Sequence, residues 1–361
     1  MAGGRRSGSG TFEHPPVRYG VIGTRTSGCE HLLALGSLEP LGAARIVAVS
    51  EPDDVFRDWA AECLPGRTDV ALHRDHRELL ARDDLDAVVV ATPHRQRPAV
   101  LADVLPTDLA VMIDPPPCTS LLECWTVVER AADRWARRGS LTWIAAGHRS
   151  LPPVERFLGA LRAGATGAIR TVTIRDHRRP VWSADGDEGC RPAATDPMLR
   201  WVHTFDLLGV AAGGPPARVM ASSSGAGDGE SELLVIVEYR NGVRGSLDLS
   251  SVADGSSHDQ VLVAVGEGAT VEATVPGSVV RIGGHDRGGA LELPVQADRR
   301  WPSRRQTGMC RDHLAFIDAV VGERPTDSSV RTATWAVVLG LGARLSLERG
   351  AAVELSDLGL P

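Results

Sequence analysis

Between residues 18 and 147, short runs of Val, Ile and Ala alternate with segments of helical character, and this alternation restricts the fold more than any other feature of the sequence. The runs are almost continuously apolar, as expected of strands buried on both faces of a parallel sheet. Strands alternating with helices imply right-handed crossovers and a doubly wound α/β sheet. The predicted strands are residues 18–23, 44–51, 71–73, 85–93, 109–114 and 141–147.

The chain of 361 residues is long for one hydrophobic core and short for three, which predicts two domains. Its 43% hydrophobic and 24% charged residues are typical of a folded, soluble protein. Acidic and basic residues are interspersed and the net charge is −7, which argues against nucleic acid or an anionic membrane as the main partner.

All 39 Lys-plus-Arg residues are arginine, so the chain contains no lysine. This excludes every mechanism that needs a lysine amine, including Schiff-base formation, a P-loop phosphate lysine and the Tyr-Lys pair of many carbonyl reductases. The six cysteines are scattered, without a C-x-x-C pair or a histidine cluster at metal spacing. We therefore expect reduced thiols, no metal and a cytoplasmic protein.

The N-terminal residues 1–16 are rich in Gly, Ser and Arg and lack the apolar core of a signal peptide. We expect them to be a disordered tail. No later segment is long and apolar enough to predict a membrane span.

The first predicted strand runs into the stretch GVIGTRTSG at residues 20–28, and a predicted helix follows. A strand, glycines and a helix in this order are typical of a dinucleotide-binding turn, G-x-G-x-x-G. Gly23 and Gly28 are present, but Arg25 replaces the middle glycine, which normally lets the pyrophosphate approach the backbone. A guanidinium can bind phosphate oxygens itself, so Arg25 indicates either an altered way of holding the cofactor or a turn that binds nothing.

In a doubly wound sheet, ligands bind beyond the carboxyl ends of the strands. Glu51 ends the second predicted strand, at about the usual spacing of 20 residues past the turn, where a carboxylate takes ribose hydroxyls and repels a 2′-phosphate. The expected cofactor is NAD or NADP with a lean to NAD; a solvated turn residue is the alternative for Glu51. The predicted cofactor-binding residues are Gly23, Thr24, Arg25, Thr26, Ser27, Gly28, Glu51, Thr92, Pro93, His94, Arg97, Asp114 and Pro115.

Four stretches in this half follow one another in a recognisable order: GVIGTRTSGCEH, VAVSEPD, DAVVVATPHRQRP and VMIDPPPCTSLLE. They resemble the runs G-x-G-x-x-G…H, V-C-D, A-T-P-N-x-x-H and E-K-P of the Gfo/Idh/MocA family of NAD(P)-dependent oxidoreductases. The later stretch RWVHTFDLL is similar to the family's H-x-x-D-L-L helix. The likeness covers nearly the whole chain from about Val17.

The resemblance implies a Rossmann domain over residues 17–149 and a C-terminal α+β domain over residues 150–361, built on an open, mostly antiparallel sheet. One face of that sheet usually mediates oligomerisation in this family, which implies a homodimer or homotetramer, with a monomer as the alternative. Strand-like alternation agrees with such a sheet. It occurs in residues 170–176, 218–224, 231–240, 244–251, 259–267, 270–276 and 278–284.

The sequence departs from the family at positions that commonly carry catalysis. The E-K-P position reads D-P-P, so Pro115 replaces the lysine that orients and protonates the substrate oxygen, and Leu199 replaces an aspartate upstream of the histidine. Losing one such donor typically costs ~2.7–4 kcal/mol in the transition state. The resemblance leaves His203 as the acid–base, with Asp206 and Asp114 as further catalytic candidates. The alternatives are helix packing or capping for His203, capping or backbone binding for Asp206, and a structural role for Asp114.

The candidates for substrate contacts are His148, Arg149, Trp182 and Arg200. The predicted reaction moves a hydride between nicotinamide and a C=O or C=N carbon of a small polar metabolite, such as a sugar, a cyclitol or an imine-type intermediate. An imine is more electrophilic than a ketone and needs less polarisation. Two alternatives stay open: a non-catalytic sensor or scaffold that keeps the cofactor, and a non-redox elimination or cyclisation in the same pocket.

Overall fold

A computed structural model describes residues 14–177, 197–224, 232–251, 259–284, 289–322 and 330–358. The chain divides into two compact units, Met1–Ser150 with Arg299–Thr334, and Leu151–Asp298 with Trp335–Pro361. The predicted division gives every residue after 149 to the second domain, whereas residues 299–334 belong with the first unit.

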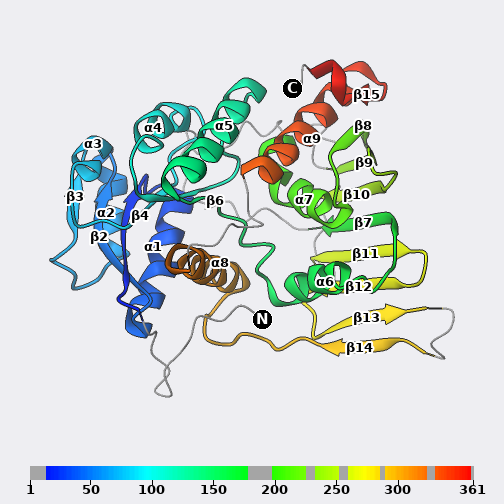
Figure 1. The fold of residues 1–361 in the computed structure, drawn as a ribbon, viewed down its shortest axis with the longest axis horizontal. Helices are drawn as coiled ribbons and strands as arrows, with labels where there is room; N and C mark the ends of the chain where they lie inside the picture. The colour runs from blue at the N-terminus through cyan, green and yellow to red at the C-terminus, as the bar shows by residue number, and fades with distance from the viewer. Residues whose placement is uncertain are drawn as a thin grey trace. The chain divides into compact units, whose positions relative to one another are not determined.

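The first unit contains a six-stranded sheet in which every neighbouring pair is parallel, in the order β3-β2-β1-β4-β5-β6 (Figure 1). All residues of β4, β5 and β6 are buried, as expected for parallel strands covered on both faces. This confirms the predicted doubly wound sheet. The strands are β1 (Val17–Ile22), β2 (Ala44–Ser50), β3 (Ala71–His73), β4 (Ala87–Val90), β5 (Ala110–Ile113) and β6 (Thr142–Ile144).

Side-chain caps fix where several helices of this unit begin. Each cap accepts a hydrogen bond from a backbone N–H of the first turn, which would otherwise lack a partner. The capping residues are Asp53, Asp75, Ser120 and Ser303. The helices are α1 (Thr26–Leu38), the 3-10 helix η1 (Glu39–Leu41), α2 (Asp54–Glu62), α3 (His76–Leu80), α4 (Arg97–Val104), α5 (Leu121–Arg138) and α8 (Arg304–Val321).

Helix α8 lies beside α1 although the two are far apart in the sequence (Figure 1). Phe316 of α8 is fully buried, and its ring contacts those of Tyr19 on β1 and Trp143 on β6. These contacts belong to the main hydrophobic core of the unit. They explain why residues 299–334 associate with the first unit.

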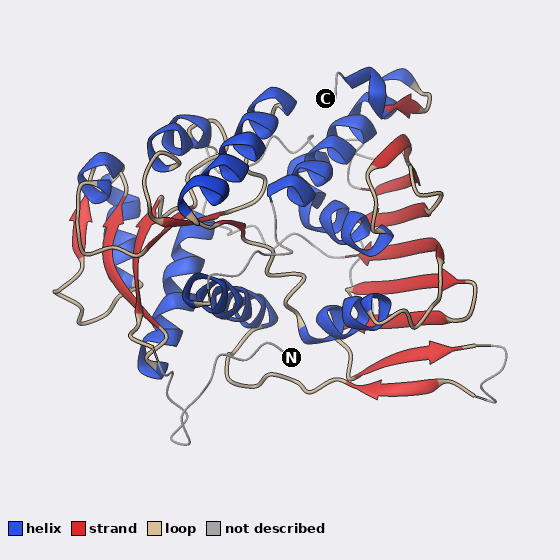
Figure 2. Ribbon diagram, viewed as in Figure 1, coloured by secondary structure: helices blue, strands red, loops and turns tan. Residues whose placement is uncertain are grey.

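The second unit is built on a nine-stranded, mostly antiparallel sheet in the order β14-β13-β12-β11-β7-β10-β9-β8-β15, which confirms the predicted fold class (Figure 2). Only the pair β10–β7 is parallel among the described strands of this sheet. Its strands are β7 (Ile169–His177), β8 (Pro216–Ser223), β9 (Glu232–Tyr239), β10 (Arg244–Ser250), β11 (Gln260–Gly266), β12 (Thr270–Val275), β13 (Val279–Gly283), β14 (Leu291–Pro294) and β15 (Val353–Glu354).

Helices cover one face of this second sheet. Helix α6 (Pro152–Arg162) packs on β12 and β13, and α7 (Pro197–Ala212) packs on β7 and β10. Gly342 of α9 (Val330–Arg349) lies so close to Val219 and Leu355 that an added Cβ would be 2.7 Å from each side chain. The last described element is the 3-10 helix η2 (Leu355–Leu358).

The described cysteines form no disulfide: Cys29, Cys63, Cys118, Cys124 and Cys310 are all thiols. Cys190 and the tail as far as residue 13 lie outside the described residues. Among the helices that the structure describes, none combines the length and hydropathy that a membrane span requires. Within the same residues, no group of three or more His, Cys, Asp or Glu side chains is arranged to hold a metal ion.

Candidate cofactor and active site

The turn between β1 and α1 depends on glycine at two positions. Gly23 has a φ of 88°, in the left-handed region, and an added Cβ would lie 2.8 Å from the backbone nitrogen of Thr92. An added Cβ on Gly28 would lie 2.0 Å from the carbonyl oxygen of Gly23. The turn therefore packs closely against the end of β4 and against its own helix, as a dinucleotide-binding turn requires.

The N-terminus of α1 is suited to an anion. Its N-cap, Arg25, makes no side-chain capping hydrogen bond, and the first turn contains no acidic residue. Unpaired backbone N–H groups and the helix dipole favour a negatively charged group at such an end. Close packing of the turn and an uncapped helix start together fit a bound pyrophosphate, which the backbone of residues 23–28 would hold.

Glu51 is only 3% exposed and ties the end of β2 to this turn. Its Oε2 accepts a hydrogen bond from the backbone nitrogen of Thr24 at 3.0 Å, and its Oε1 accepts one from that of Asp53 at 3.1 Å. A carboxylate has about four lone-pair sites, so each oxygen can accept a further hydrogen bond. Glu51 therefore shapes the turn and keeps the capacity to accept ribose hydroxyls.

Arg25 turns away from the loop and towards the start of α2. Its guanidinium lies 4.2 Å from the centre of the Phe56 ring, and its NH2 lies 3.6 Å from Asp53 Oδ2. The side chain remains 26% exposed. The stacking and the ion pair place the positive charge beside the β2 end, where an adenosine would lie in a doubly wound sheet.

Arg97 fastens the ends of β4 and β5 together. The side chain is 1% exposed and donates to the carbonyl oxygens of Thr92, Asp114 and Pro116, with the contact to Thr92 at 2.6 Å. Its NH2 also lies 3.5 Å from Asp114 Oδ2. Although the sequence places Arg97 among the cofactor contacts, these bonds give it a structural part in shaping the two strand ends.

Two buried polar atoms at the β4 end have no hydrogen-bond partner within the described residues: His94 Nδ1 and Thr92 Oγ1. Burial, reinforced by the charge of Arg97, lowers the pKa of His94 to about 4, so its imidazole is neutral at pH 7. Unpaired buried polar groups are costly, and a bound ligand would satisfy them. They agree with the prediction that residues 92–94 bind the cofactor.

A buried cluster of polar side chains lies beside Asp114, and the sequence did not predict it. Asp114 Oδ1 lies 3.6 Å from Nε2 of His31 on α1, and His31 Nδ1 lies 2.9 Å from Nε2 of His313 on α8. The neighbouring Asp312 accepts hydrogen bonds from the nitrogen of Ala146 at 2.8 Å and from Trp143 Nε1. Burial raises the pKa of Asp312 to about 7, against the effect of these donors. His31 occupies the histidine of the G-x-G-x-x-G…H run, but no sequence signal connects it with His313.

His203 and Asp206 lie on α7 of the second unit, three residues apart and therefore on neighbouring turns of one helix face. His203 is half-buried and Asp206 is 9% exposed. The helix is anchored to the sheet by the Thr204 hydroxyl, which donates to Asp176 Oδ2, and the same oxygen accepts from Gln260 Nε2 at 2.8 Å. Sequence reasoning missed this anchor because its three residues lie on separate elements.

The other predicted substrate contacts are only partly described. His148 and Arg149 are half-buried in the loop that follows β6 in the first unit. Trp182 lies outside the described residues, as does the side chain of Arg200.

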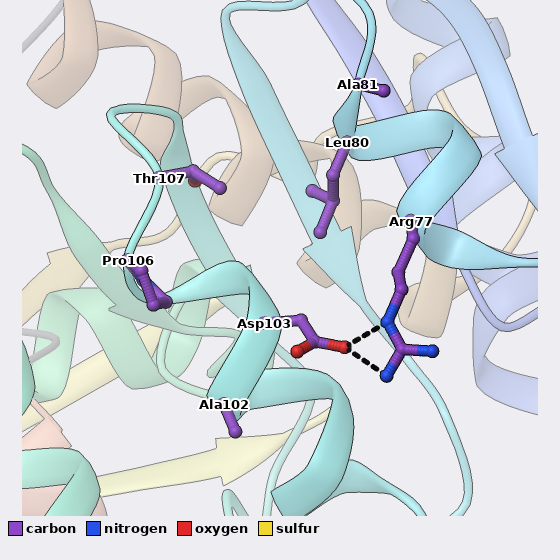
Figure 3. A pocket seen from close by; sticks show the side chains of 7 residues that line it. All are labelled: Arg77, Leu80, Ala81, Ala102, Asp103, Pro106 and Thr107. Carbon is purple, nitrogen blue, oxygen red and sulfur yellow. Dashed lines mark hydrogen bonds and ion pairs between the residues drawn. The ribbon is translucent and has the colours of Figure 1, made fainter.

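A surface hollow of 370 Å³ in the first unit lies away from the strand ends described above (Figure 3). Its wall comes from α3, the C-terminal part of α4 and the residues that follow each helix, and Arg77 NH2 pairs with Asp103 Oδ2 across it at 3.0 Å. Because α4 starts at the carboxyl end of β4, its C-terminal part lies towards the opposite edge of the sheet. The hollow is therefore separate from the candidate cofactor site. It is lined by Arg77, Leu80, Ala81, Ala102, Asp103, Pro106 and Thr107.

The parallel sheet, its glycine turn and the carboxylate after β2 define a Rossmann dinucleotide-binding unit joined to a second, sheet-based unit. Comparison with known families agrees: residues 17–137 match the NAD-binding Rossmann domain of the oxidoreductase family Gfo/Idh/MocA, and residues 156–272 match a C-terminal domain of the same family. The chain belongs to the Gfo/Idh/MocA family, and it is an NAD-binding oxidoreductase.

Similar proteins extend along most of the chain. Inositol 2-dehydrogenase 1 of Saccharopolyspora erythraea is 26% identical over 289 residues, 79% of this chain and 80% of that protein. Inositol 2-dehydrogenase of Leifsonia xyli subsp. xyli is 28% identical over 317 residues, 85% of each. The fold is similar to the crystal structure of an oxidoreductase from Agrobacterium radiobacter in complex with NAD+, L-tartaric acid and magnesium, with a TM-score of 0.76 and 16% identity over 95% of this chain and 99% of that one.

Proposed function

We propose that the protein oxidises a secondary alcohol of a small polyhydroxylated molecule, a cyclitol or a sugar, with NAD, or reduces the matching C=O or C=N carbon with NADH. The observation that carries this proposal is the likeness to inositol 2-dehydrogenases over about four-fifths of the chain, together with the retained turn and Glu51. NAD is preferred over NADP because Glu51 would repel a 2′-phosphate.

When bound, NAD would supply the hydride chemistry at its nicotinamide ring. In the chain itself, the backbone of residues 23–28 would hold the pyrophosphate and Glu51 would accept hydrogen bonds from the ribose hydroxyls. His203 exchanges a proton with the substrate oxygen through an imidazole nitrogen, and Asp206 orients that imidazole. This assignment rests on the family position of the two residues and on the suitability of an imidazole for proton transfer near pH 7.

The test combines cofactor titration with turnover. Purified protein is titrated with NADH and NADPH by fluorescence, and NADH formation from myo-inositol, other cyclitols and sugars is followed, with imines assayed in the reverse direction. We expect NADH to bind more tightly than NADPH, and at least one polyol to turn over. His203→Asn should lower kcat about 10²- to 10⁴-fold while NADH affinity stays unchanged. His73→Asn, a change on β3, serves as the control.

The outcomes separate the candidate functions. Absence of binding by either nucleotide would reject the cofactor assignment. Binding without turnover of any substrate would favour a sensor or scaffold, and product formation without net change in NADH would favour an elimination or cyclisation. An active His203→Asn variant would remove His203 from the mechanism.

We further propose a cytoplasmic homodimer or homotetramer that associates through the uncovered face of the nine-stranded sheet. On this face Ile236 of β9 is paired in register with Met220 of β8 on one side and with Ser246 of β10 on the other. Ile236 and Met220 are each 48% exposed. Leu234 on the same strand is 52% exposed and Val265 of β11 is 40% exposed. An apolar patch of this kind is typical of an interaction surface.

Sedimentation velocity measures the oligomeric state directly. The wild type should sediment as a dimer or larger, and Ile236→Arg should shift it towards monomer because a charge would be buried in the interface. Val321→Arg, at an exposed apolar position of the first unit, should not change the oligomeric state. A monomeric wild type would contradict the proposal.

A further inference from the structure

Two histidines in the first unit form a buried pair that no step above uses. His31 on α1 is 1% exposed and His313 on α8 is fully buried. Because His31 Nδ1 and His313 Nε2 are 2.9 Å apart, one nitrogen must donate a proton and the other must accept it. Burial, reinforced by the proximity of His31, lowers the pKa of His313 well below its ordinary value, so His313 is neutral.

The pair faces Asp114, the residue that follows β5. His31 Nε2 lies 3.6 Å from Asp114 Oδ1, and Arg97 NH2 lies 3.5 Å from Oδ2, so the carboxylate is held between a ring and a guanidinium. Asp114 also interacts electrostatically with Glu30 of α1 and with His94 after β4. Its side chain is 18% exposed, whereas those of His31 and Arg97 are 2% and 1% exposed. Of these three groups, the carboxylate is the one that a ligand can reach.

The proton arrangement follows from the chemistry of the contacts. A carboxylate accepts hydrogen bonds only, so the favourable arrangement places a proton on His31 Nε2. His31 Nδ1 is then bare and accepts from His313 Nε2–H, so that the N–H at His31 Nε2 faces Asp114 Oδ1 at the end of β5. At 3.6 Å, the contact between His31 Nε2 and Asp114 Oδ1 is longer than a hydrogen bond and is electrostatic.

Asp114 directly precedes Pro115, which occupies the place of the family's lysine. A lysine would present donors to the substrate oxygen, whereas Asp114 presents an acceptor. We propose that His31, backed by His313, is a positioning residue that holds the Asp114 carboxylate ready to accept a hydrogen bond from a substrate hydroxyl, so that the site selects polyols. The positioning rests on geometry in the first unit; the selection of polyols rests on the proposed function.

The first measurement needs neither substrate nor cofactor. Imidazole nitrogen NMR of the ¹⁵N-histidine-labelled full-length protein, with signals assigned by His31→Gln and His313→Gln, reports where each proton lies. We expect the His313 ring to be neutral at pH 7, and the Nε2 of each ring to carry a proton. A bare Nε2 on His31 would overturn the proposal.

The second measurement follows the Asp114 carboxyl carbon by ¹³C NMR, assigned with Asp114→Asn. In His31→Leu this carbon should titrate at a higher pH than in the wild type, because an N–H that faces the carboxylate is lost. His31→Gln, which can place an N–H near the same point, should restore the wild-type titration. His76→Leu is the matched control, since His76 Nε2 pairs with Asp103 Oδ2 at 2.9 Å away from the site. Identical titration of Asp114 in the wild type and His31→Leu would overturn the proposal.

The third measurement separates this proposal from the proposed function. If a polyol turns over, His31→Leu should raise its KM about tenfold and leave the affinity for NADH unchanged, and His31→Gln should recover most of the loss. An unchanged KM in a folded His31→Leu would overturn the selection of polyols. Failure of every polyol to turn over would contradict the proposed function and the selection of polyols, whereas the two NMR measurements would still decide whether His31 positions Asp114.

Discussion

Gly28→Ala is expected to weaken NADH binding at least about 100-fold, a loss of about 2.7 kcal/mol. The added Cβ would lie 2.0 Å from the carbonyl oxygen of Gly23, which belongs to the backbone and cannot rotate away. Either α1 or the turn must shift, and both are needed to bring backbone N–H groups to the pyrophosphate. Forced overpacking of this kind also lowers the free energy of unfolding by about 1–3 kcal/mol.

Gly36→Ala provides a matched control within the same helix, because no atom lies within 4 Å of its added Cβ. Alanine in a helix interior is favoured over glycine by about 0.5–1 kcal/mol, so this variant should be slightly more stable and should bind NADH as the wild type does. Isothermal titration with NADH and urea denaturation of both variants give the comparison. Gly28→Ala protein that binds NADH within threefold of the wild type would show that the turn does not contact the cofactor.

Arg97→Met is expected to lower the free energy of unfolding by about 3–5 kcal/mol, the range found when one partner of a buried ion pair is removed. Methionine keeps much of the apolar stem, so the loss reports the guanidinium. Without it, the carbonyl oxygens of Thr92, Asp114 and Pro116 lose a buried donor, and Asp114 loses a cation. NADH affinity should fall as well, because the β4 and β5 ends are no longer fastened to each other.

Arg95→Met is the control for this change, since Arg95 is an exposed arginine of the same turn. Its effect should stay within about 0.5 kcal/mol, as for most surface substitutions. Urea denaturation monitored by tryptophan fluorescence measures the free energy of unfolding of both variants. Equal stability of the Arg97→Met and Arg95→Met variants would show that the buried guanidinium contributes no net stabilisation.

The sequence predicted the first unit well because its strands carry their own signal. The runs ending at Gly23, Glu51 and Asp114 are almost continuously apolar, and each leads into a predicted helix or turn. The sheet and its ligand-binding edge could therefore both be predicted. The strand β14 (Leu291–Pro294) was not predicted: it has only four residues, three of which are exposed, so its alternation is too short to identify a strand.

The site was less predictable, because distant residues meet there. His31 and His313 are 282 positions apart, and helical periodicity shows that α8 has an apolar face without showing which helix it meets. The spacing of Glu51 identified a carboxylate after β2 but not its bonds to the backbone of Thr24 and Asp53. Arg97 could be read as a phosphate ligand until its bonds to three carbonyls were visible. Sequence patterns identify the residues at strand ends. The packing of the folded chain decides which of these residues bond to the protein's own backbone and which can contact a ligand.

The return of α8 to the first unit makes both units discontinuous: residues 151–298 of the second unit separate the two segments of the first, and residues 299–334 of the first separate the two segments of the second. A cut after Ser150 would separate β1 and β6 from Phe316, leaving Tyr19 and Trp143 without a ring that covers them in the intact core. It would also remove Asp312, which bonds the backbone at Ala146. The cofactor-binding unit is thus completed only after synthesis has passed through most of the other unit, so neither half of the chain is an independent module.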